Sequence, residues 1–326
     1  MFAVPDSLRA VFRLGPAKPE AAPVRVRQGR IYILPTQPGL AFAGVLAVML
    51  VASINYGISL GYAFTFLLGG VGVASVLSAF RNLFRLSIRY GKAESAFPGG
   101  NVVFHLLIDN PDSRRRPALR LIGHNKQGET LFDLPPGVCS EILLAMPAQR
   151  RGVMPMGRTV IETRWPLGLV RAWSVIVPDM EALVFPRPEA APPAPALFPG
   201  NRSVDWGNSG TGSEDFANLR TYQDTDSPRH LAWKVYARGG EIMTKEFSAS
   251  AGSELFLEWD HLPAGMPEEA RLSRLAAWLL RAEHASQRYA LRLPACEFPI
   301  ARGEEHLRRC LGALALHGTK REQKWK

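Results

Sequence analysis

The longest apolar stretch of the chain covers residues 31–80 and contains no charged residue. Its two halves, 39–54 and 58–80, are rich in aliphatic residues and are separated by a short polar segment. Together they are about twice as long as the roughly 20 apolar residues that one membrane-spanning helix needs. The pattern predicts a transmembrane helical hairpin over residues 36–80, with one long, kinked helix as the alternative.

Basic residues concentrate at the two outer ends of this stretch. Residues 1–30 carry a net charge of +4 and residues 81–92 another +4, whereas the polar segment between the halves carries none. On the assumption of a bacterial inner membrane, the positive-inside rule predicts that both termini and the soluble domains lie in the cytoplasm. Tyr32 and Tyr56 are expected at the lipid–water interfaces, where tyrosine is enriched.

The formal net charge of the whole chain is +10, and its distribution decides what it means. We expect basic tails at residues 1–35 and 320–326, and the second of these carries +3. The tails and residues 81–92 account for more than the whole excess, which leaves −1 for the rest. A nucleic-acid-binding domain would carry the basic residues itself. The distribution argues against a nucleic-acid partner and makes the lipid bilayer the expected one.

After the hairpin, short apolar runs alternate with turn residues such as Pro, Gly, Asp and Asn. Strands are expected at residues 101–110, 118–123, 140–148, 158–165, 168–177 and 181–186. Short strands at this spacing predict a small antiparallel β-sandwich over residues 93–186. His105 and His124, on or beside these strands, are interpreted as structural.

The composition changes again at residues 187–202, which are rich in proline and are interpreted as a semi-rigid linker. Beyond them we expect strands at residues 241–247, 254–259 and 288–294, and helices at 228–238, 267–287 and 303–316. Strands that alternate with helices predict an α/β domain over residues 203–319, with a partly parallel sheet.

The glycine-rich segment 207–215 invites comparison with catalytic and nucleotide-binding motifs, and each fails at a required position. Ser213 stands where a phosphate-binding loop has its lysine. Asp215 stands where a dinucleotide-binding motif has its third glycine. The residues around Ser209 break the nucleophile-elbow pattern. The cysteines, which we interpret as packing residues, lack CxxC spacing. We therefore expect no catalytic residue, no cofactor and no metal.

The charged segment that follows has two structural interpretations. Asp226, Arg229 and Lys234, together with Glu214 and Arg220, have the spacing of an internal lattice of ion pairs. The same charges would form a docking surface if they faced outward.

The order of residues in this segment is more specific than its composition. The residues that carry the pattern are Glu214, Asp215, Phe216, Leu219, Arg220, Tyr222, Asp226, Arg229, Trp233, Lys234, Arg238, Lys245, Glu246 and Phe247. They resemble the signature of the domain-of-unknown-function family fifty-eight. The chain departs from that signature at Asp215, which replaces a glutamate, at Thr225, which replaces a glycine, and at Leu231, which replaces an isoleucine.

This resemblance implies a truncated von Willebrand factor A-like domain. It also implies, as partners, a MoxR-type AAA+ ATPase and a transglutaminase-like membrane protein. In von Willebrand A domains a D-x-S-x-S loop supplies oxygen ligands to a divalent metal, but here Asp260 is followed by His261, Leu262 and Pro263. With so few oxygen ligands we expect a metal-free version.

Together these patterns predict a membrane-anchored, non-enzymatic adaptor or scaffold that presents its cytoplasmic domain to such partners. The alternative is an uncharacterised hydrolase or transferase that uses His230 with Asp224 or Asp226.

Overall fold

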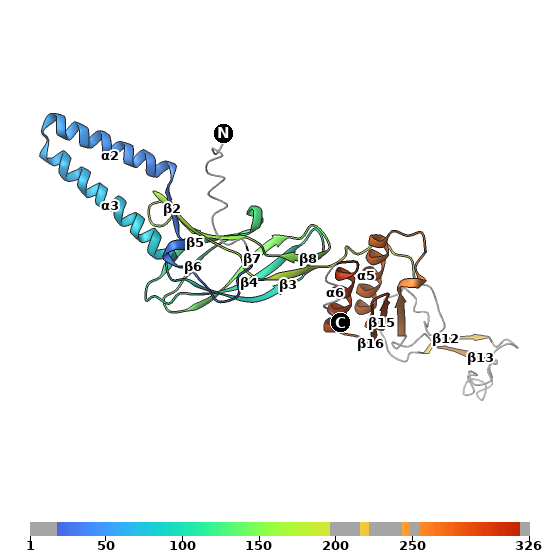
Figure 1. Ribbon diagram of the computed structural model, residues 1–326. Helices are drawn as coiled ribbons and strands as arrows, with labels where there is room; N and C mark the ends of the chain where they lie inside the picture. Colours follow the sequence, from blue (N-terminus) through green and yellow to red (C-terminus); the bar gives the residue numbers. More distant parts are fainter. Residues whose placement is uncertain (1–17, 196–215, 222–242, 248–253, 320–326) are drawn as a thin grey trace. The chain divides into compact units, whose positions relative to one another are not determined.

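The computed structural model describes residues 18–195, 216–221, 243–247 and 254–319 of the chain (Figure 1). The chain divides into two compact units, Met1–Val184 and Phe185–Lys326. The first unit contains the helical hairpin and the β-sandwich, and the second contains an α/β layer.

The apolar stretch forms two helices, α2 (Gln37–Tyr56) and α3 (Ser59–Leu83), joined by a tight turn (Figure 1). Gly57 ends α2 in the left-handed conformation, at φ 63°, and its N–H donates to the carbonyl of Ser53. The predicted hairpin is therefore confirmed, and the single kinked helix is wrong. The second helix extends to Leu83, beyond the predicted boundary at residue 80.

Both helices are long and apolar enough to span a membrane. Their large apolar side chains point outward rather than into a protein core: Val48 is 70% exposed, Leu60 69% and Phe66 68%. A core helix of a soluble protein buries such side chains, whereas lipid chains solvate them. The exposure therefore agrees with the predicted membrane anchor.

Two antiparallel sheets follow from the short apolar runs. One has the order β1 (Val24–Arg25), β3 (Ser87–Glu94), β4 (Asn101–Asp109) and β7 (Cys139–Pro147). The other has the order β2 (Tyr32–Pro35), β10 (Val170–Ile176), β9 (Thr159–Thr163), β5 (Arg116–Ile122) and β6 (Glu129–Leu134). A separate pair joins β8 (Gly152–Pro155) to β11 (Glu181–Val184).

One hydrophobic core lies between the two sheets. Phe104 and Leu106 of β4 and Leu119 and Leu121 of β5 are fully buried in the same cluster. Side chains of alternate residues point to opposite faces of a strand, so each sheet turns one face to this core. The six predicted strands are present: five of them belong to the two antiparallel sheets of the sandwich, and the sixth, β11, pairs with β8.

The prediction of a basic tail over residues 1–35 is wrong in its second half. Val24 pairs with Ile88 in the first sheet, and Pro35 pairs with Val170 in the second. The sequence pattern did not reveal these strands because they are short and contain proline and arginine. The segment thus contributes a strand to each sheet before the chain enters the hairpin.

In the second unit, β14 (Glu254–Glu258) and β15 (Arg288–Leu293) are parallel and are connected through α5 (Glu268–His284). β16 (Cys296–Ala301), which was not predicted, is antiparallel to β15 and leads into α6 (Glu304–Leu316). The sheet is therefore partly parallel, as predicted. A further antiparallel pair consists of β12 (Phe216–Thr221) and β13 (Met243–Phe247). The helix predicted at residues 228–238 lies outside the described residues.

The first part of the proline-rich segment 187–202 is not a free linker. The carbonyl of Pro193 accepts a hydrogen bond from the indole Nε1 of Trp278 at 2.7 Å, and Glu189 pairs with Arg274 at 2.8 Å. Both partners lie on α5. An extended proline-rich backbone has no internal hydrogen bonds, so its carbonyls are available to side chains of a neighbouring helix.

Candidate functional site

The described residues bring the largest set of buried polar groups together where the hairpin joins the sandwich. Arg116, the first residue of β5, has a side chain that is 2% exposed. Its Nη1 donates to the carbonyls of Asn82 and Phe84, at 3.0 and 2.8 Å, at the end of α3. A helix leaves its last carbonyls without partners inside the helix, and a cation there also stabilises the helix dipole. Arg116 therefore caps α3.

The other nitrogens of Arg116 are also satisfied. Nε donates to Oδ1 of Asn110 at 2.7 Å, and Nη2 pairs with Oδ2 of Asp112 at 2.7 Å. Burial lowers the pKa of Arg116, and the charge and hydrogen bond of Asp112 oppose this shift. A buried guanidinium is tolerated when its donors have such partners.

Asn82 provides a second connection between α3 and the sandwich. This residue is 5% exposed, and its amide Nδ2 donates to the carbonyl of Pro117 at 2.8 Å and to Oγ1 of Thr163 at 3.0 Å. The same Thr163 hydroxyl accepts from the N–H of Trp165 at 3.2 Å. Thr163 therefore links α3 to the chain segment that follows β9.

That segment, residues 164–169, also holds the first turn of α2. The N–H of Thr36, the N-cap residue, donates to the carbonyl of Leu169 at 2.9 Å. The Thr36 hydroxyl accepts from the N–H of Gly39 at 3.2 Å and lies 3.0 Å from the same Leu169 carbonyl. A Cβ on Gly39 would lie 1.9 Å from that carbonyl oxygen, so this close approach requires glycine. The loop is thus bonded directly to the start of α2 and, through Thr163 of β9, indirectly to α3.

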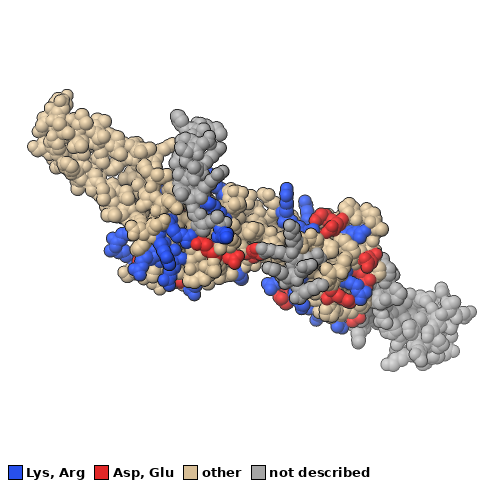
Figure 2. Space-filling view, in the orientation of Figure 1, with Lys and Arg blue, Asp and Glu red and all other residues tan. Residues whose placement is uncertain are grey.

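Exposed arginines surround this joint. Figure 2 shows Lys and Arg side chains gathered where the sandwich meets the hairpin. We use the name basic collar for the exposed side chains of Arg81, Arg85, Arg114, Arg115 and Arg164. Within the collar, Arg115 pairs with Asp133, and Arg164 lies 4.0 Å from Glu162. The collar is therefore mainly positive at the end of the sandwich from which the helices emerge.

The outer face of the second sheet carries one buried acid. Glu162 is 2% exposed and is held by Arg120 at 2.7 Å and by Arg171. The guanidinium of Arg171 also lies 5.0 Å from the ring centre of Trp173. Because the charges are paired and stacked on neighbouring strands, this cluster fits a structural role.

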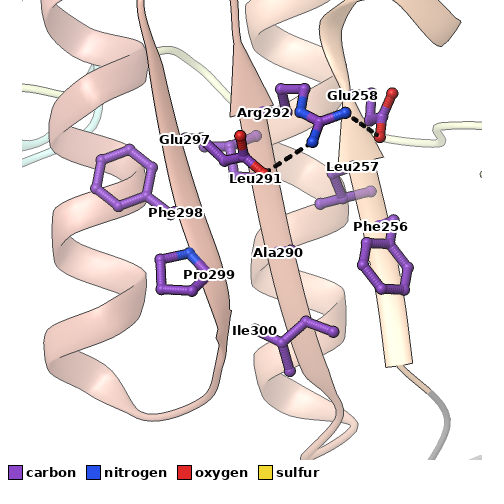
Figure 3. A pocket seen from close by; sticks show the side chains of 10 residues that line it. All are labelled: Phe256, Leu257, Glu258, Ala290, Leu291, Arg292, Glu297, Phe298, Pro299 and Ile300. Atoms are coloured by element: carbon purple, nitrogen blue, oxygen red, sulfur yellow. Dashed lines mark hydrogen bonds and ion pairs between the residues drawn. The ribbon is translucent and has the colours of Figure 1, made fainter.

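A shallow hollow of about 270 Å³ lies on the sheet of the second unit (Figure 3). Leu257 and Leu291 are buried, so the alternate positions, including Phe256 and Arg292, belong to the opposite face. Figure 3 shows the helices behind the sheet and the side chains of Phe256 and Arg292 in front of it. The hollow thus lies on the face turned away from α5 and α6.

Ion pairs cross all three strands of this sheet. Arg292 pairs with Glu258 at 3.3 Å and with Glu297 at 2.9 Å (Figure 3). The hydrogen bond and charge of Glu297, followed by the charge of Glu258, raise the pKa of Arg292. The three charged side chains of the lining are therefore paired with one another, and the remaining lining is largely apolar. In the sequence, the only signal of the hollow was the alternation of polar and apolar residues in these strands.

The residues predicted as signature or docking residues divide into two groups. Phe216, Leu219 and Arg220 lie on β12, and Lys245 and Phe247 lie on β13. Phe216 pairs with Phe247, and Leu219 with Lys245, so the pairing brings the two ends of the signature together. Glu246 also lies on β13. The other signature positions, and the alternative catalytic residues, lie outside the described residues: Glu214, Asp215, Tyr222, Asp224, Asp226, Arg229, His230, Trp233, Lys234 and Arg238.

Asp260 lies in a 3-10 turn, Trp259–His261, directly after β14. Within residues 18–195, 216–221, 243–247 and 254–319, no group of three or more His, Cys, Asp or Glu side chains is placed to hold a metal. The expectation that Asp260 binds no metal stays a prediction.

Comparison with known proteins identifies little. No family model matches the chain. Over 103 residues the chain is 33% identical to the uncharacterized protein YeaD of Bacillus subtilis (strain 168). The matched part is 31% of this chain and 26% of YeaD, so the chain matches about a quarter of the length of that relative.

Proposed function

We propose that the protein is a membrane-anchored, non-enzymatic adaptor that holds a cytoplasmic α/β unit at a bacterial inner membrane and presents it to other proteins. The observation that carries the proposal is the joint at Arg116, Asn82 and Thr36. It fixes both outer ends of the hairpin to one sandwich. Such an anchor keeps the sandwich, and with it the chain that follows, attached to the membrane.

Two observations support a non-enzymatic role: the composition of the glycine-rich segment, and the residues that line the hollow on the sheet of the second unit. The glycine-rich segment 207–215 fails each catalytic template. The lining of the hollow on β14, β15 and β16 combines apolar side chains with the ion-paired Glu258, Arg292 and Glu297. A nucleophile next to a general base, the usual arrangement in covalent catalysis, is not formed by these lining residues.

The second unit is proposed to be a truncated von Willebrand factor A-like domain of the family fifty-eight type. Support comes from the parallel strands β14 and β15, connected through α5, and from Asp260 directly after β14. The register of Phe216 with Phe247 supports the idea that the signature acts as one structural unit.

The proposed partners are a MoxR-type AAA+ ATPase and a transglutaminase-like membrane protein, and co-purification tests them. The full-length chain, extracted in mild detergent from cells that express such an ATPase, is expected to retain it. Lys234→Ala is expected to weaken retention if the signature faces outward, whereas Lys18→Ala, far from the signature in the sequence, serves as the matched control. Recovery of no AAA+ protein with the wild-type chain contradicts the proposal.

A further inference from the structure

We propose that the loop 164–169 of the sandwich is a lipid-contact site. In this proposal Trp165 and Leu167 enter the headgroup region of an anionic bilayer beside α2. The inference rests on the proposed membrane anchor, and it adds a second contact with the bilayer that the helices themselves do not provide.

The position of the loop is fixed from both helices. Thr36 at the start of α2 bonds to Leu169 at one end of the loop, and Thr163 connects Trp165 to Asn82 of α3 at the other. Within the loop, the N–H of Gly168 donates to the carbonyl of Arg164 at 2.8 Å. The loop therefore remains next to the first turn of α2.

The length of α2 determines the depth of the loop. The helix has 20 residues. At about 1.5 Å per residue it is about 30 Å long, which matches the hydrocarbon thickness of a typical bilayer. Because the helix is no longer than the hydrocarbon core is thick, its first residue must lie at the lipid–water interface. Because Thr36 immediately precedes that residue and bonds to Leu169, the loop lies at the same level.

The exposed side chains of the loop suit this environment. Trp165 is 45% exposed and Leu167 is 54% exposed, although both lie outside the membrane helices. Tryptophan is enriched at membrane interfaces, where its ring contacts lipid and its N–H remains accessible to polar groups. Arg164 and the rest of the basic collar lie around the same end of the sandwich and would attract anionic headgroups. The exposed apolar side chains of Trp165 and Leu167, next to the arginines of the basic collar, thus complement an anionic lipid surface.

The test uses the full-length chain reconstituted in vesicles that contain brominated phospholipids, which quench nearby tryptophan emission. Trp165→Phe is expected to lose a share of the lipid-quenchable emission, and Leu167→Trp is expected to add to it. Trp278→Phe is the matched control, because Trp278 is bonded to Pro193 in the second unit. An unchanged quenchable emission in Trp165→Phe overturns the inference. Emission of Trp165 that is shielded from aqueous acrylamide but not quenched by lipid also overturns it, because a protein would then cover the residue.

Two further comparisons separate the parts of the proposal. Val48→Trp places an emitter in the middle of α2, where the native side chain is 70% exposed. If Val48→Trp is quenched and Trp165 is not, the anchor stands and the lipid-contact site fails; if neither is quenched, the anchor itself fails. Brominated phosphatidylglycerol is expected to quench Trp165 more than brominated phosphatidylcholine at equal mole fraction. Equal quenching overturns the preference for anionic lipid.

Discussion

Arg116 is one of the buried residues that hold α3 to the sandwich. Replacement by methionine keeps much of the side-chain volume but leaves the carbonyls of Asn82 and Phe84 without their donor. The amide oxygen of Asn110 also loses its donor, whereas Asp112, whose side chain is 40% exposed, remains solvated. Each buried acceptor left without a donor typically costs about 1–3 kcal/mol. We expect Arg116→Met to lower the melting temperature of the detergent-solubilised chain by at least about 6 °C, at roughly 2 °C per kcal/mol for a chain of this size.

The neighbouring Arg115 provides the control for this experiment. Its side chain is 69% exposed and pairs with Asp133 at the surface. Exposed pairs contribute only about 0–1 kcal/mol, so Arg115→Met is expected to melt close to the wild-type temperature. Equal melting of the two variants would show that Arg116 does not hold the joint.

Cys139 is exposed, so its interpretation as a packing residue is wrong, whereas Cys310 is buried. A hydrogen bond with Asp109 raises the pKa of Cys139, and burial raises that of Cys310 to about 12. Alkylation requires the thiolate. We expect Asp109→Asn to lower the pKa of Cys139 and to increase its alkylation rate by iodoacetamide at pH 8, measured by mass spectrometry of the labelled peptide.

Cys310 serves as the internal reference in the same digest. It is expected to stay unlabelled in the native protein and to react after denaturation. If Asp109→Asn slows the alkylation of Cys139 or leaves its rate unchanged, the hydrogen bond of Asp109 does not control this thiol.

At the scale of the elements, the two helices of the hairpin meet most closely near their turn. A Cβ on Gly61 would lie 2.2 Å from Oγ of Ser53, whereas a Cβ on Gly69 would meet nothing within 4 Å. We expect Gly61→Ala to push the helices apart and to destabilise the hairpin in a detergent melt, while Gly69→Ala has little effect. Adding Ser53→Gly to Gly61→Ala is expected to recover stability. No recovery, or equal loss at both glycines, would exclude this contact as the cause.

The helices and most strands were predictable because their signals are local. The hairpin follows from an uncharged run, and β4 follows from a nine-residue run that is largely apolar. β1 and β2 were missed because their partners, Ile88 and Val170, are distant in sequence and the segment itself reads as basic tail. The pattern of polar and apolar residues within 24–35 does not indicate which strands these residues pair with.

The candidate site was less predictable because its residues, too, depend on partners that are distant in sequence. Trp165 reads as the end of a strand, and its place beside α2 arises only when Thr36 bonds to the loop. Arg116 follows Arg114 and Arg115 in the sequence, and nothing local distinguishes it from them, because its burial depends on the carbonyls of α3. Polar residues acquire such roles from tertiary neighbours, which local patterns do not specify.

At the scale of the whole molecule, both outer ends of the hairpin attach to one sandwich, so a spanning hairpin must return to the side from which it entered. We expect reporters fused at the N-terminus and at Lys326 to indicate the cytoplasm, and a reporter inserted at Asn55 to indicate the opposite side. The basic flanks at residues 1–30 and 81–92 determine this direction. A periplasmic C-terminus would contradict the predicted orientation.

The pairing of β2 with β10 has a consequence for biosynthesis. Pro35 leaves the ribosome long before Val170, its partner in the second sheet. At about 5–20 residues per second, on the order of ten seconds separate the two. During that interval the hairpin has been completely synthesised, whereas β10, the strand with which β2 pairs, has not. Insertion of α2 and α3 into the bilayer can therefore precede formation of the second sheet. In that case β2 remains unpaired beside the membrane until β10 has been translated.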